Sequence, residues 1–362
     1  IPVVSSFLGI DVLPSDHSCA IGRIGVKGTR TGNFTMQNAD LLIAIGSRLS
    51  VSSMGFDDNT FAREAKIVVV DIDPIEHQKN TFHKDMLIIS DAKIFINALR
   101  KELEGKLAAH SYAPWLNKTV NWKKQYPVCL PIYDDDSQGI NYYKMLDLIN
   151  GYTDSRRPVI SDAGSAFYVT SQSINLKEGE RYIPSGALAT MGFTLPASIG
   201  VAIADLNNTV IGITGDGSLQ QNIQELQILK QYQLPVKLFV MNNHGYLSIR
   251  SSQRKFFHDH FVAEGPSSGV TFPDLALIAK AYGLDYYSLD TIDKAKTLLP
   301  TIFNDNKPTI IEVRTIDFQE IIPSSSSKIL PDGSMKSMPL EDMYPFLDRT
   351  EFLDNMVIKP VE

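Results

Sequence analysis

Short apolar runs alternate with helix-spaced apolar positions along the first third of the chain. The runs cover 3–7, 41–46 and 67–72, with a weaker one at 88–89. Runs that are apolar throughout are typical of parallel strands buried on both faces, and their alternation with helices indicates a doubly wound sheet. Residues 1–105 are therefore predicted to form an α/β domain.

The same alternation resumes at Ile140 and continues to residue 318. We expect a helix through Ile149 and amphipathic helices over 275–282 and 292–303. The strands are expected over 158–161, 210–214, 236–241 and 309–313. This is a second parallel sheet with helices on both faces, so the predicted fold class is α/β with two doubly wound domains.

Two less regular stretches flank the second domain. Residues 106–139 are polar and contain proline, which is typical of an interdomain linker. Trp115, Trp122 and Tyr126 lie in a helical part of this stretch and are expected to pack rather than to recognise a ligand. The tail, residues 319–362, is irregular and rich in Ser, Pro and Met. It is predicted to be a lid or an interface arm, with a disordered tail as the alternative.

A glycine-rich turn follows the strand over 210–214. Gly215, Gly217 and Ser218 surround Asp216, and apolar residues at helical spacing come next. Glycines give the backbone unusual freedom, and the N-terminus of a helix offers unpaired N–H groups to an anion. This turn is predicted to hold a phosphate, although Gly-Asp-Gly alone is also an ordinary turn.

A second turn, Asn242-Asn243-His244-Gly245-Tyr246, follows the strand over 236–241. The two strands and the helix between them form a βαβ unit, so both turns are expected at one edge of the sheet. There the Asp216 carboxylate and the Asn243 amide oxygen can converge on a hard cation such as Mg²⁺. The pair predicts a site for a magnesium-bound diphosphate.

Other candidate residues lie after strands or beside these turns. Ala163, Gly164 and Ser165 follow the strand over 158–161, where small residues allow close approach by a phosphate. Met191 lies in a glycine-containing stretch before a helix, and a lone methionine there is more often core filler. Tyr246, Arg250, Gln253 and Arg254 could face a substrate, although exposed arginines on a helix are more often solvated.

The first domain offers a further edge for a ligand. Gly46-Ser47-Arg48 and Asp71-Ile72-Asp73 end two of its predicted strands. Nucleotides bind at the carboxyl ends of strands in open α/β sheets. The alternative is that these residues simply end strands.

Composition narrows the class of partner. The formal net charge is −7 and no lysine run or basic patch appears, which argues against nucleic acid and anionic membranes. No run of about 18 apolar residues occurs, so no membrane span is expected. Cys19 and Cys129 fit neither a metal spacing nor a disulfide framework, and are expected to be reduced thiols in a cytoplasmic protein.

The two turns together resemble the signature of the thiamine diphosphate enzymes, which is GDG followed by NN. Here 24 residues separate Gly217 from Asn242. The segments PVVSSFLG, GVKGTRTGN, NADLLIAIGSR and VVVDIDP resemble the central domain of acetolactate synthase-like enzymes. The tail resembles those of members from bacterial surface-polysaccharide clusters.

The resemblance implies roles for the candidate residues. Asp216, Asn243 and the Gly245 carbonyl would bind Mg²⁺, and Tyr246 would lie against the cofactor. Met191 would hold the cofactor in a bent shape. The remaining cofactor contacts would come from Ala163, Gly164, Ser165, Ala189 (through its carbonyl), Gly215, Gly217 and Ser218. The group's central domain often holds FAD, but Leu49-Ser50-Val51-Ser52 replaces its acidic and arginine residues, so FAD stays open.

The resemblance also implies the reaction: thiamine diphosphate-dependent decarboxylation of a 2-oxo acid such as pyruvate, with carboligation to a second carbonyl. The alternatives are a simple decarboxylase or lyase, a carboligase acting on a nucleotide-linked keto-sugar, and an inactive cofactor-binding fragment. The chain begins in a strand without an initiator methionine, and the family's glutamate that activates the cofactor has no counterpart in it. We therefore expect a longer native chain, a homodimer or homotetramer with active sites between subunits, and no enzymatic turnover by this polypeptide alone.

Overall fold

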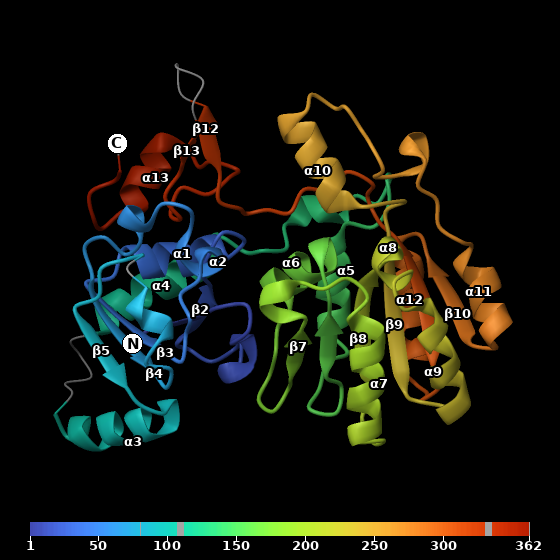
Figure 1. The fold of residues 1–362 in the computed structure, drawn as a ribbon, viewed down its shortest axis with the longest axis horizontal. Coiled ribbons are helices and arrows are strands. Elements are labelled where there is room, and N and C mark those ends of the chain that lie inside the picture. Colours follow the sequence, from blue (N-terminus) through green and yellow to red (C-terminus); the bar gives the residue numbers. More distant parts are fainter. Residues whose placement is uncertain (80, 107–111, 330–334, 362) are drawn as a thin grey trace. The chain divides into compact units, whose positions relative to one another are not determined.

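The computed structural model describes residues 1–79, 81–106, 112–329 and 335–361. The chain divides into two compact units (Figure 1). Unit 1 contains Ile1–Gly9, His17–Pro127 and Ile322–Glu362, and unit 2 contains Ile10–Asp16 and Val128–Ile321. Residues 107–111 of the expected linker, and 330–334 and 362 of the expected tail, lie outside the described residues. The domain boundaries expected from the sequence stay predictions.

Unit 2 is built on a six-stranded sheet with the order β10-β11-β9-β8-β6-β7, in which every pair is parallel. Its strands are β6 (Val159–Ser161), β7 (Tyr182–Pro184), β8 (Val210–Gly215), β9 (Val236–Asn242), β10 (Asp285–Leu289) and β11 (Thr309–Arg314). The chain passes from β6 to β7 on one side and then returns to β8 on the other, so the strand order reverses between β6 and β8. Open α/β sheets bind ligands at the carboxyl ends of strands beside such a reversal.

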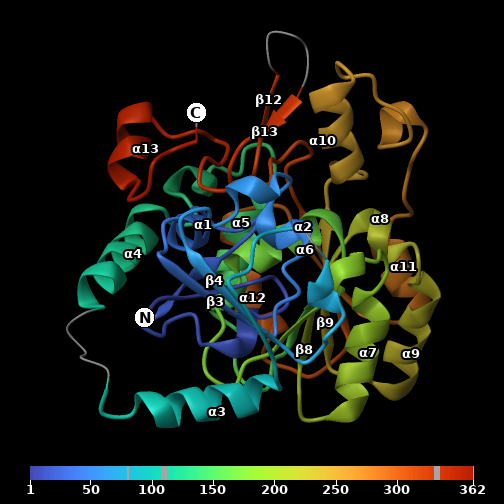
Figure 2. The ribbon, with the colours of Figure 1, turned by 60° about the vertical axis from the view of Figure 1, so that its left-hand side comes forward.

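Helices cover both faces of this sheet. They are α5 (Tyr142–Asn150), α6 (Gly164–Ser173), α7 (Thr194–Ala204), α8 (Asp216–Leu219), α9 (Leu226–Tyr232), α10 (Leu247–Phe256), α11 (Leu275–Tyr282) and α12 (Ile292–Ile302). Figure 2 shows α7, α9 and α11 beside β8 and β9. Alternate residues of a strand point to opposite faces. Phe239 and Met241 of β9 therefore pack with α5, α6 and α12, while Leu238 and Val240 pack with α7, α9 and α11. The doubly wound α/β fold is confirmed.

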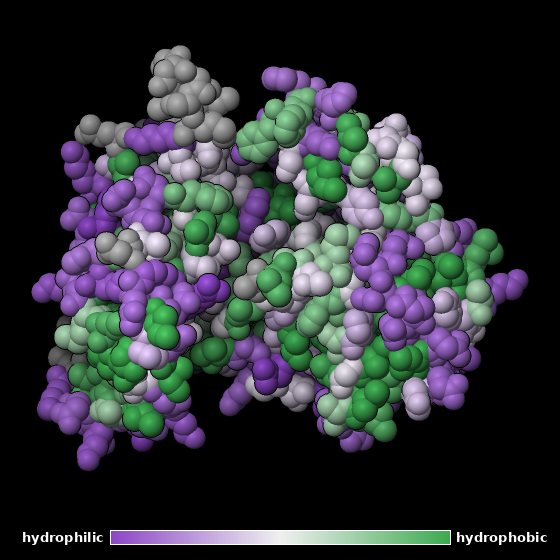
Figure 3. Space-filling model, viewed as in Figure 1, coloured by the Kyte–Doolittle hydropathy of each residue, from purple (hydrophilic) through white to green (hydrophobic). Residues whose placement is uncertain are grey.

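Unit 1 contains two smaller parallel sheets, β1-β2 and β3-β4-β5. Its elements are β1 (Val3–Ser5), β2 (Ala20–Arg23), α1 (Arg30–Gln37), β3 (Leu41–Ile45), α2 (Val51–Met54), β4 (Lys66–Asp71), β5 (Met86–Ile89), α3 (Ala92–Leu103) and α4 (Ala113–Gln125). All four strands expected from the apolar runs are present. Apolar residues of β3 and β5 are exposed, and Figure 3 shows a hydrophobic area in this part of unit 1.

The C-terminal part of unit 1 packs against its N-terminal part. This part contains β12 (Ser327–Ile329), β13 (Met335–Ser337) and α13 (Arg349–Asn355). Leu340 joins a core that includes Ile24 and Phe61. The carboxylate of Glu341, fully buried, accepts hydrogen bonds from Gln37 (2.7 Å) and Arg63 (2.7 Å). Residues 340 and 341 thus belong to the interior of unit 1.

The aromatic residues of α4, and Tyr126 directly after it, have the packing role expected of them. The Trp122 ring lies 5.3 Å from Phe34 of α1 and 5.6 Å from Trp115, and the Tyr126 ring lies 5.9 Å from Phe34. Phe352 of α13 completes this cluster.

On the face drawn in Figure 3, hydrophilic and hydrophobic residues are mixed. No helix among the described residues is long and apolar enough to cross a membrane.

Candidate functional site

The turns after β8 and β9 meet at the carboxyl edge of the unit 2 sheet. Asp216 begins α8, and the backbone N–H of Gly245 donates to its Oδ2 (3.1 Å). The helix expected after this turn is interrupted: α8 ends at Leu219, a short 3-10 turn covers Ile223–Glu225, and α9 begins at Leu226. Asn222 lies in the interruption, and its side chain donates to the Gly192 carbonyl (2.9 Å).

Asp216 is a buried carboxylate, 3% exposed. Burial raises its pKa to about 6, because a charged carboxylate is poorly solvated there, and the N–H groups of Gly217 and Gly245 oppose the rise. Gly217 donates to Oδ1 at 2.8 Å. Each oxygen therefore receives one backbone hydrogen bond and keeps further lone pairs for a cation.

The Asn243 side chain lies in the adjoining turn and is 5% exposed. Within the described residues its Oδ1 has no hydrogen-bond partner. Buried oxygen atoms without a partner are uncommon and call for an explanation, such as a bound ion. The structure thus brings a carboxylate and an unpartnered amide oxygen to neighbouring turns, and this pair fits a hard cation.

Gly217 is required by the side chain of Tyr246. A Cβ at residue 217 would lie 2.4 Å from Tyr246 Cε1, closer than atoms approach. The Tyr246 ring also makes an edge contact with Phe272 at 5.5 Å. Tyr246 therefore packs on the backbone of the first turn.

Space for a ligand remains on the other side of that turn. A Cβ at Gly215 would meet no atom within 4 Å. The first N–H groups of α8 have no carbonyl partner inside the helix, and that of Gly217 bonds Asp216 Oδ1 instead. Open space beside the start of α8 fits a diphosphate bound by N–H groups other than that of Gly217.

Asp162 is the residue that the sequence did not reveal. It directly follows β6 and is fully buried. Its Oδ2 accepts from Thr214 Oγ1 (2.8 Å) and Ser218 Oγ (2.7 Å), and its Oδ1 accepts from the Ala163 N–H (2.7 Å). Burial raises its pKa, and these hydrogen bonds oppose the rise. The only sequence signal was an acidic residue at the end of an apolar strand.

These contacts fix the part of Ser218 that can serve a ligand. The hydroxyl donates its one proton to Asp162 and accepts from the Gly192 N–H (2.8 Å). A diphosphate would therefore be left with the backbone N–H of Ser218. The same hydroxyl links α8 to the stretch that carries Met191.

Met191 and Ala189 lie in that stretch. Both the N–H and the carbonyl of Gly192 bond to the 218–222 region, which places Met191 beside the first turn. The Met191 side chain is 37% exposed, so it is not core filler. Ala189 has a left-handed backbone (φ 48°), as expected of a residue held by its surroundings rather than by its own preference.

Ala163, Gly164 and Ser165 form the start of α6, beside Asp162. Gly164 has φ 56°, and a Cβ there would lie 3.2 Å from Ser248 Oγ of α10. The small residues thus allow α6 to begin close to α10. The structure brings three turns together: those after β6, β8 and β9.

Arg250, Gln253 and Arg254 of α10 have partners within the chain. Arg250 is 4% exposed and bonds to backbone carbonyls, so the expectation that it faces a substrate is wrong. Gln253 bonds to the backbone of Val262, and Arg254 pairs with Asp259 at 3.1 Å. Sequence spacing placed them on one helix but gave no sign of these partners.

The polar groups at the carboxyl ends of β3 and β4 are also engaged. Asp71 accepts the Asp73 N–H (2.9 Å) and lies 3.1 Å from His77 Nε2. Asp73 Oδ1 accepts the Glu76 N–H (3.2 Å), and Arg48 pairs with Glu76 at 3.0 Å. The polar groups at these two strand ends thus bond to one another and to the backbone, and FAD stays open.

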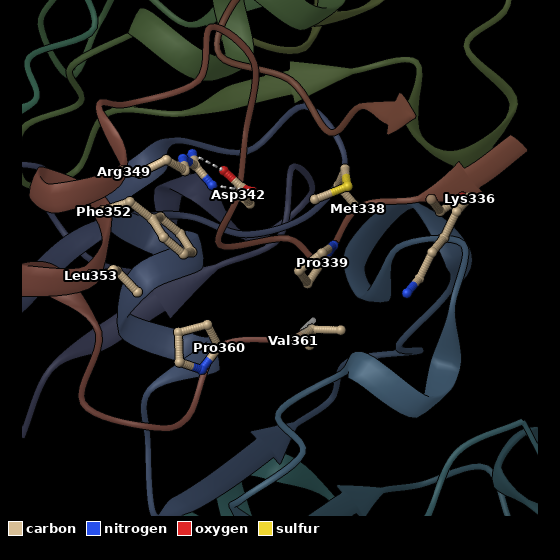
Figure 4. A pocket seen from close by; sticks show the side chains of 10 residues that line it. Lys336, Met338, Pro339, Asp342, Arg349, Phe352, Leu353, Pro360 and Val361 are labelled. Atoms are coloured by element: carbon tan, nitrogen blue, oxygen red, sulfur yellow. Dashed lines mark hydrogen bonds and ion pairs between the residues drawn. The ribbon is translucent and has the colours of Figure 1, made fainter. Parts of the chain in front are cut away.

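A cavity of about 320 Å³ lies within unit 1 (Figure 4). Its lining includes Met338, Pro339, Phe352 and Pro360, and Arg349 at its edge donates to both carboxylate oxygens of Asp342. All lining residues come from the C-terminal part of the chain. None of the predicted site residues reaches it.

The described residues contain no group of three or more His, Cys, Asp and Glu side chains arranged to hold a metal ion. The pair at the two turns has one acidic member, so its cation would take further ligands from a backbone carbonyl, water and a phosphate.

Comparisons with known proteins follow the same division of the chain. The family model described as "Thiamine pyrophosphate enzyme, C-terminal TPP binding domain" matches residues 162–313. The model described as "Thiamine pyrophosphate enzyme, central domain" matches residues 1–99. The first match includes all three turns described above.

The chain is similar to acetolactate synthase large subunits. It is 31% identical over 315 residues to that of Cyanidium caldarium, covering 86% of this chain and 52% of the relative. It is 30% identical over 363 residues to that of Lactococcus lactis (98% and 58%). A probable acetolactate synthase large subunit of Methanocaldococcus jannaschii is 31% identical over 333 residues (89% and 54%). The chain spans about half the length of the curated relatives it matches.

Proposed function

Because the chain belongs to the thiamine pyrophosphate enzymes, we propose that unit 2 binds thiamine diphosphate through Mg²⁺ at the turns after β8 and β9. Asp216, Asn243 and the Gly245 carbonyl hold the cation, and the N–H of Ser218 at the start of α8 holds the diphosphate. The observation that carries the proposal is the unpartnered, buried Asn243 Oδ1 next to a turn whose Gly245 N–H bonds Asp216. A cation between these oxygens would satisfy Asn243 and offset the burial of the Asp216 charge.

Thiamine diphosphate supplies an electron sink that allows carbon dioxide to leave a 2-oxo acid. The chain's own residues bind and orient it. Gly215 leaves the space for the diphosphate, and Tyr246 packs behind the first turn at Gly217. Met191, fixed to that turn through Gly192, supports the cofactor ring, and the Ala189 carbonyl accepts a hydrogen bond from its amino group.

We further propose that the whole protein decarboxylates pyruvate and joins the two-carbon unit to a second carbonyl, in an oligomer whose active sites lie between subunits. The similarity to acetolactate synthase large subunits supports this reaction class. A simple 2-oxo acid decarboxylase and a carboligase acting on a keto-sugar are the alternatives. The acceptor distinguishes all three.

Product analysis tests this proposal. The full-length protein is incubated with Mg²⁺, thiamine diphosphate and pyruvate. In one mixture pyruvate is both donor and acceptor, and in the other a nucleotide-linked keto-sugar is added as the acceptor. The products are identified by mass spectrometry. Acetolactate supports the first reaction, acetaldehyde the second and a two-carbon sugar adduct the third. The Asp216→Ala variant is the matched control, because it removes the one anionic ligand. Consumption of pyruvate by that variant at the parent rate would contradict the proposed site.

A further inference from the structure

Arg250 is a buried cation whose donors all point at one region. Its Nη1 donates to the Asn243 carbonyl (3.0 Å) and to the Asp317 carbonyl, and its Nη2 donates to the His244 carbonyl (3.1 Å). Its Nε donates to the Glu264 carboxylate. The guanidinium thus holds two consecutive carbonyls of the turn after β9. These bonds use four of the five N–H donors of the guanidinium, and all four acceptors belong to the chain itself.

Glu264 holds the same turn from the other side. Its side chain is buried (4% exposed) and pairs with Arg250, while its backbone carbonyl accepts the Tyr246 N–H at 2.7 Å. The Ser268 hydroxyl accepts the Glu264 N–H (2.9 Å) and donates to the Gly265 carbonyl (3.0 Å). Glu264 therefore connects the loop after α10 to the turn after β9.

These groups pack closely around two glycines. A Cβ at Gly245 would lie 2.0 Å from the Glu264 carbonyl oxygen and 2.5 Å from Arg250 Nη2. Gly245 also has φ 153°, which residues with a side chain rarely adopt. A Cβ at Gly265 would lie 2.7 Å from the same Nη2. The ion pair is packed directly against the turn.

The turn is thus held on two sides. Arg250 and Glu264 fix the carbonyls of 243 and 244 and the N–H of 246, while the Gly245 N–H bonds Asp216. Between these anchors lies the Asn243 side chain with its unpartnered Oδ1. We propose that Arg250 and Glu264 are positioning residues that hold the turn in the shape that binds the divalent cation.

This inference rests on the proposed function, because it concerns the same cation. It adds that the order of the loop over 257–274 is coupled to cation binding, because Glu264 lies in this loop and bonds the turn after β9. The Arg250 side chain bonds two carbonyls of one ligand-bearing turn, and the Glu264 side chain, which pairs with Arg250, belongs to the residue whose backbone carbonyl bonds a third group of that turn. Arginine suits the role, because its planar fork reaches several carbonyls at once and a lysine cannot.

The test uses the full-length protein and calorimetric titration with thiamine diphosphate at a series of Mg²⁺ concentrations. Arg250→Lys keeps the charge but loses the fork, and Glu264→Gln keeps the shape but loses the charge. Arg254→Lys is the matched control, since Arg254 lies on the same helix with its partner Asp259 at the surface. We expect the Mg²⁺ concentration for half-saturation to rise roughly 10–100-fold in the first two variants, as for other residues that orient metal ligands, and to stay unchanged in the control.

The readout separates positioning from general damage. If Arg250 and Glu264 act on the cation turn, saturating Mg²⁺ restores the parent affinity for thiamine diphosphate, and the double variant is no worse than the weaker single variant. Hydrogen exchange over 257–274 should also slow when Mg²⁺ and cofactor are added to the parent and not to Arg250→Lys. If the parent needs Mg²⁺ to bind the cofactor and both variants have the same Mg²⁺ concentration for half-saturation as the parent, the inference is overturned and the proposed function is not. A parent that needs no Mg²⁺ would overturn the proposed function instead.

Discussion

Replacing Asp216 by Asn should change how the stability of the metal-free protein depends on pH. Asp216→Asn removes the charge and keeps the size of the side chain. The parent carboxylate is 3% exposed, and burial raises its pKa to about 6 despite the hydrogen bonds from Gly217 and Gly245. An asparagine has no charge to bury at any pH, so the variant lacks this dependence.

The magnitude follows from the difference between the folded and unfolded states. An unfolded aspartate titrates near pH 3.9, about two pH units lower, and one unit corresponds to about 1.4 kcal/mol. Between about pH 4 and pH 6 the folded parent holds a proton that the unfolded chain has released, so its free energy of unfolding falls as the pH rises. The total loss is roughly 3 kcal/mol, complete above about pH 6. We therefore expect the free energy of unfolding of Asp216→Asn, minus that of the parent, to rise by this amount between about pH 4 and pH 6.

The assay must report unit 2. Both tryptophans, Trp115 and Trp122, belong to unit 1, so intrinsic tryptophan fluorescence would follow the wrong part of the chain. Hydrogen exchange of the β8 and β9 amides, measured in EDTA at matched pH in variant and parent, reports the free energy of opening for this sheet. Comparing the two proteins at each pH cancels the intrinsic exchange rates and any constant effect of the asparagine.

A difference that stays flat from about pH 4 to pH 7 would refute the reasoning, because it would mean that the Asp216 carboxylate is not desolvated in the folded state. A difference that falls with pH would mean that the charged form is favoured by its surroundings. Added Mg²⁺ provides a second check: above about pH 6 it should slow exchange in the parent and leave the variant unchanged.

Three further substitutions address single contacts. Asn243→Ala should leave the metal-free protein close to parent stability, because its Oδ1 has no partner to lose, and should weaken Mg²⁺-dependent cofactor binding at least roughly tenfold by calorimetry. Gly217→Ala should lower the thermal midpoint, since its Cβ would overlap Tyr246, at a cost of roughly 1–3 kcal/mol that Tyr246→Ala relieves. Met191→Ala should keep most of the cofactor affinity and slow deuterium exchange at the thiazolium C2, followed by NMR; an unchanged rate would indicate that Met191 does not support the ring.

The sequence predicted the frame of the site well because its signals were local. The apolar runs located β8 and β9, and the parallel pairing of a βαβ unit placed their turns at one edge, which the Gly245 to Asp216 hydrogen bond confirms. Asp216 and Asn243 were predicted to bind a cation from this geometry, and that role stays a prediction. The broken helix after α8 was missed because Asn222 is held by Gly192, which lies 30 residues earlier in the chain.

Asp162, Arg250 and Glu264 could not be predicted from the sequence, because their partners also lie far away in the chain. Asp162 acts on Thr214 and Ser218, more than 50 residues away, and no periodicity links them. Arg250 and Glu264 resemble ordinary surface charges on a helix and a loop, and only folding shows that both are buried against one turn. Long-range polar contacts of this kind have no local pattern.

The most direct measurement is calorimetric titration of thiamine diphosphate into the full-length protein, with Mg²⁺ and with EDTA, in the parent and in Asp216→Ala. The proposed site predicts one cofactor bound per chain in the parent with Mg²⁺ and a loss of binding on removing either the cation or the carboxylate. The proposed site would be contradicted if the parent in EDTA and Asp216→Ala with Mg²⁺ both bound the cofactor as tightly as the parent with Mg²⁺ does.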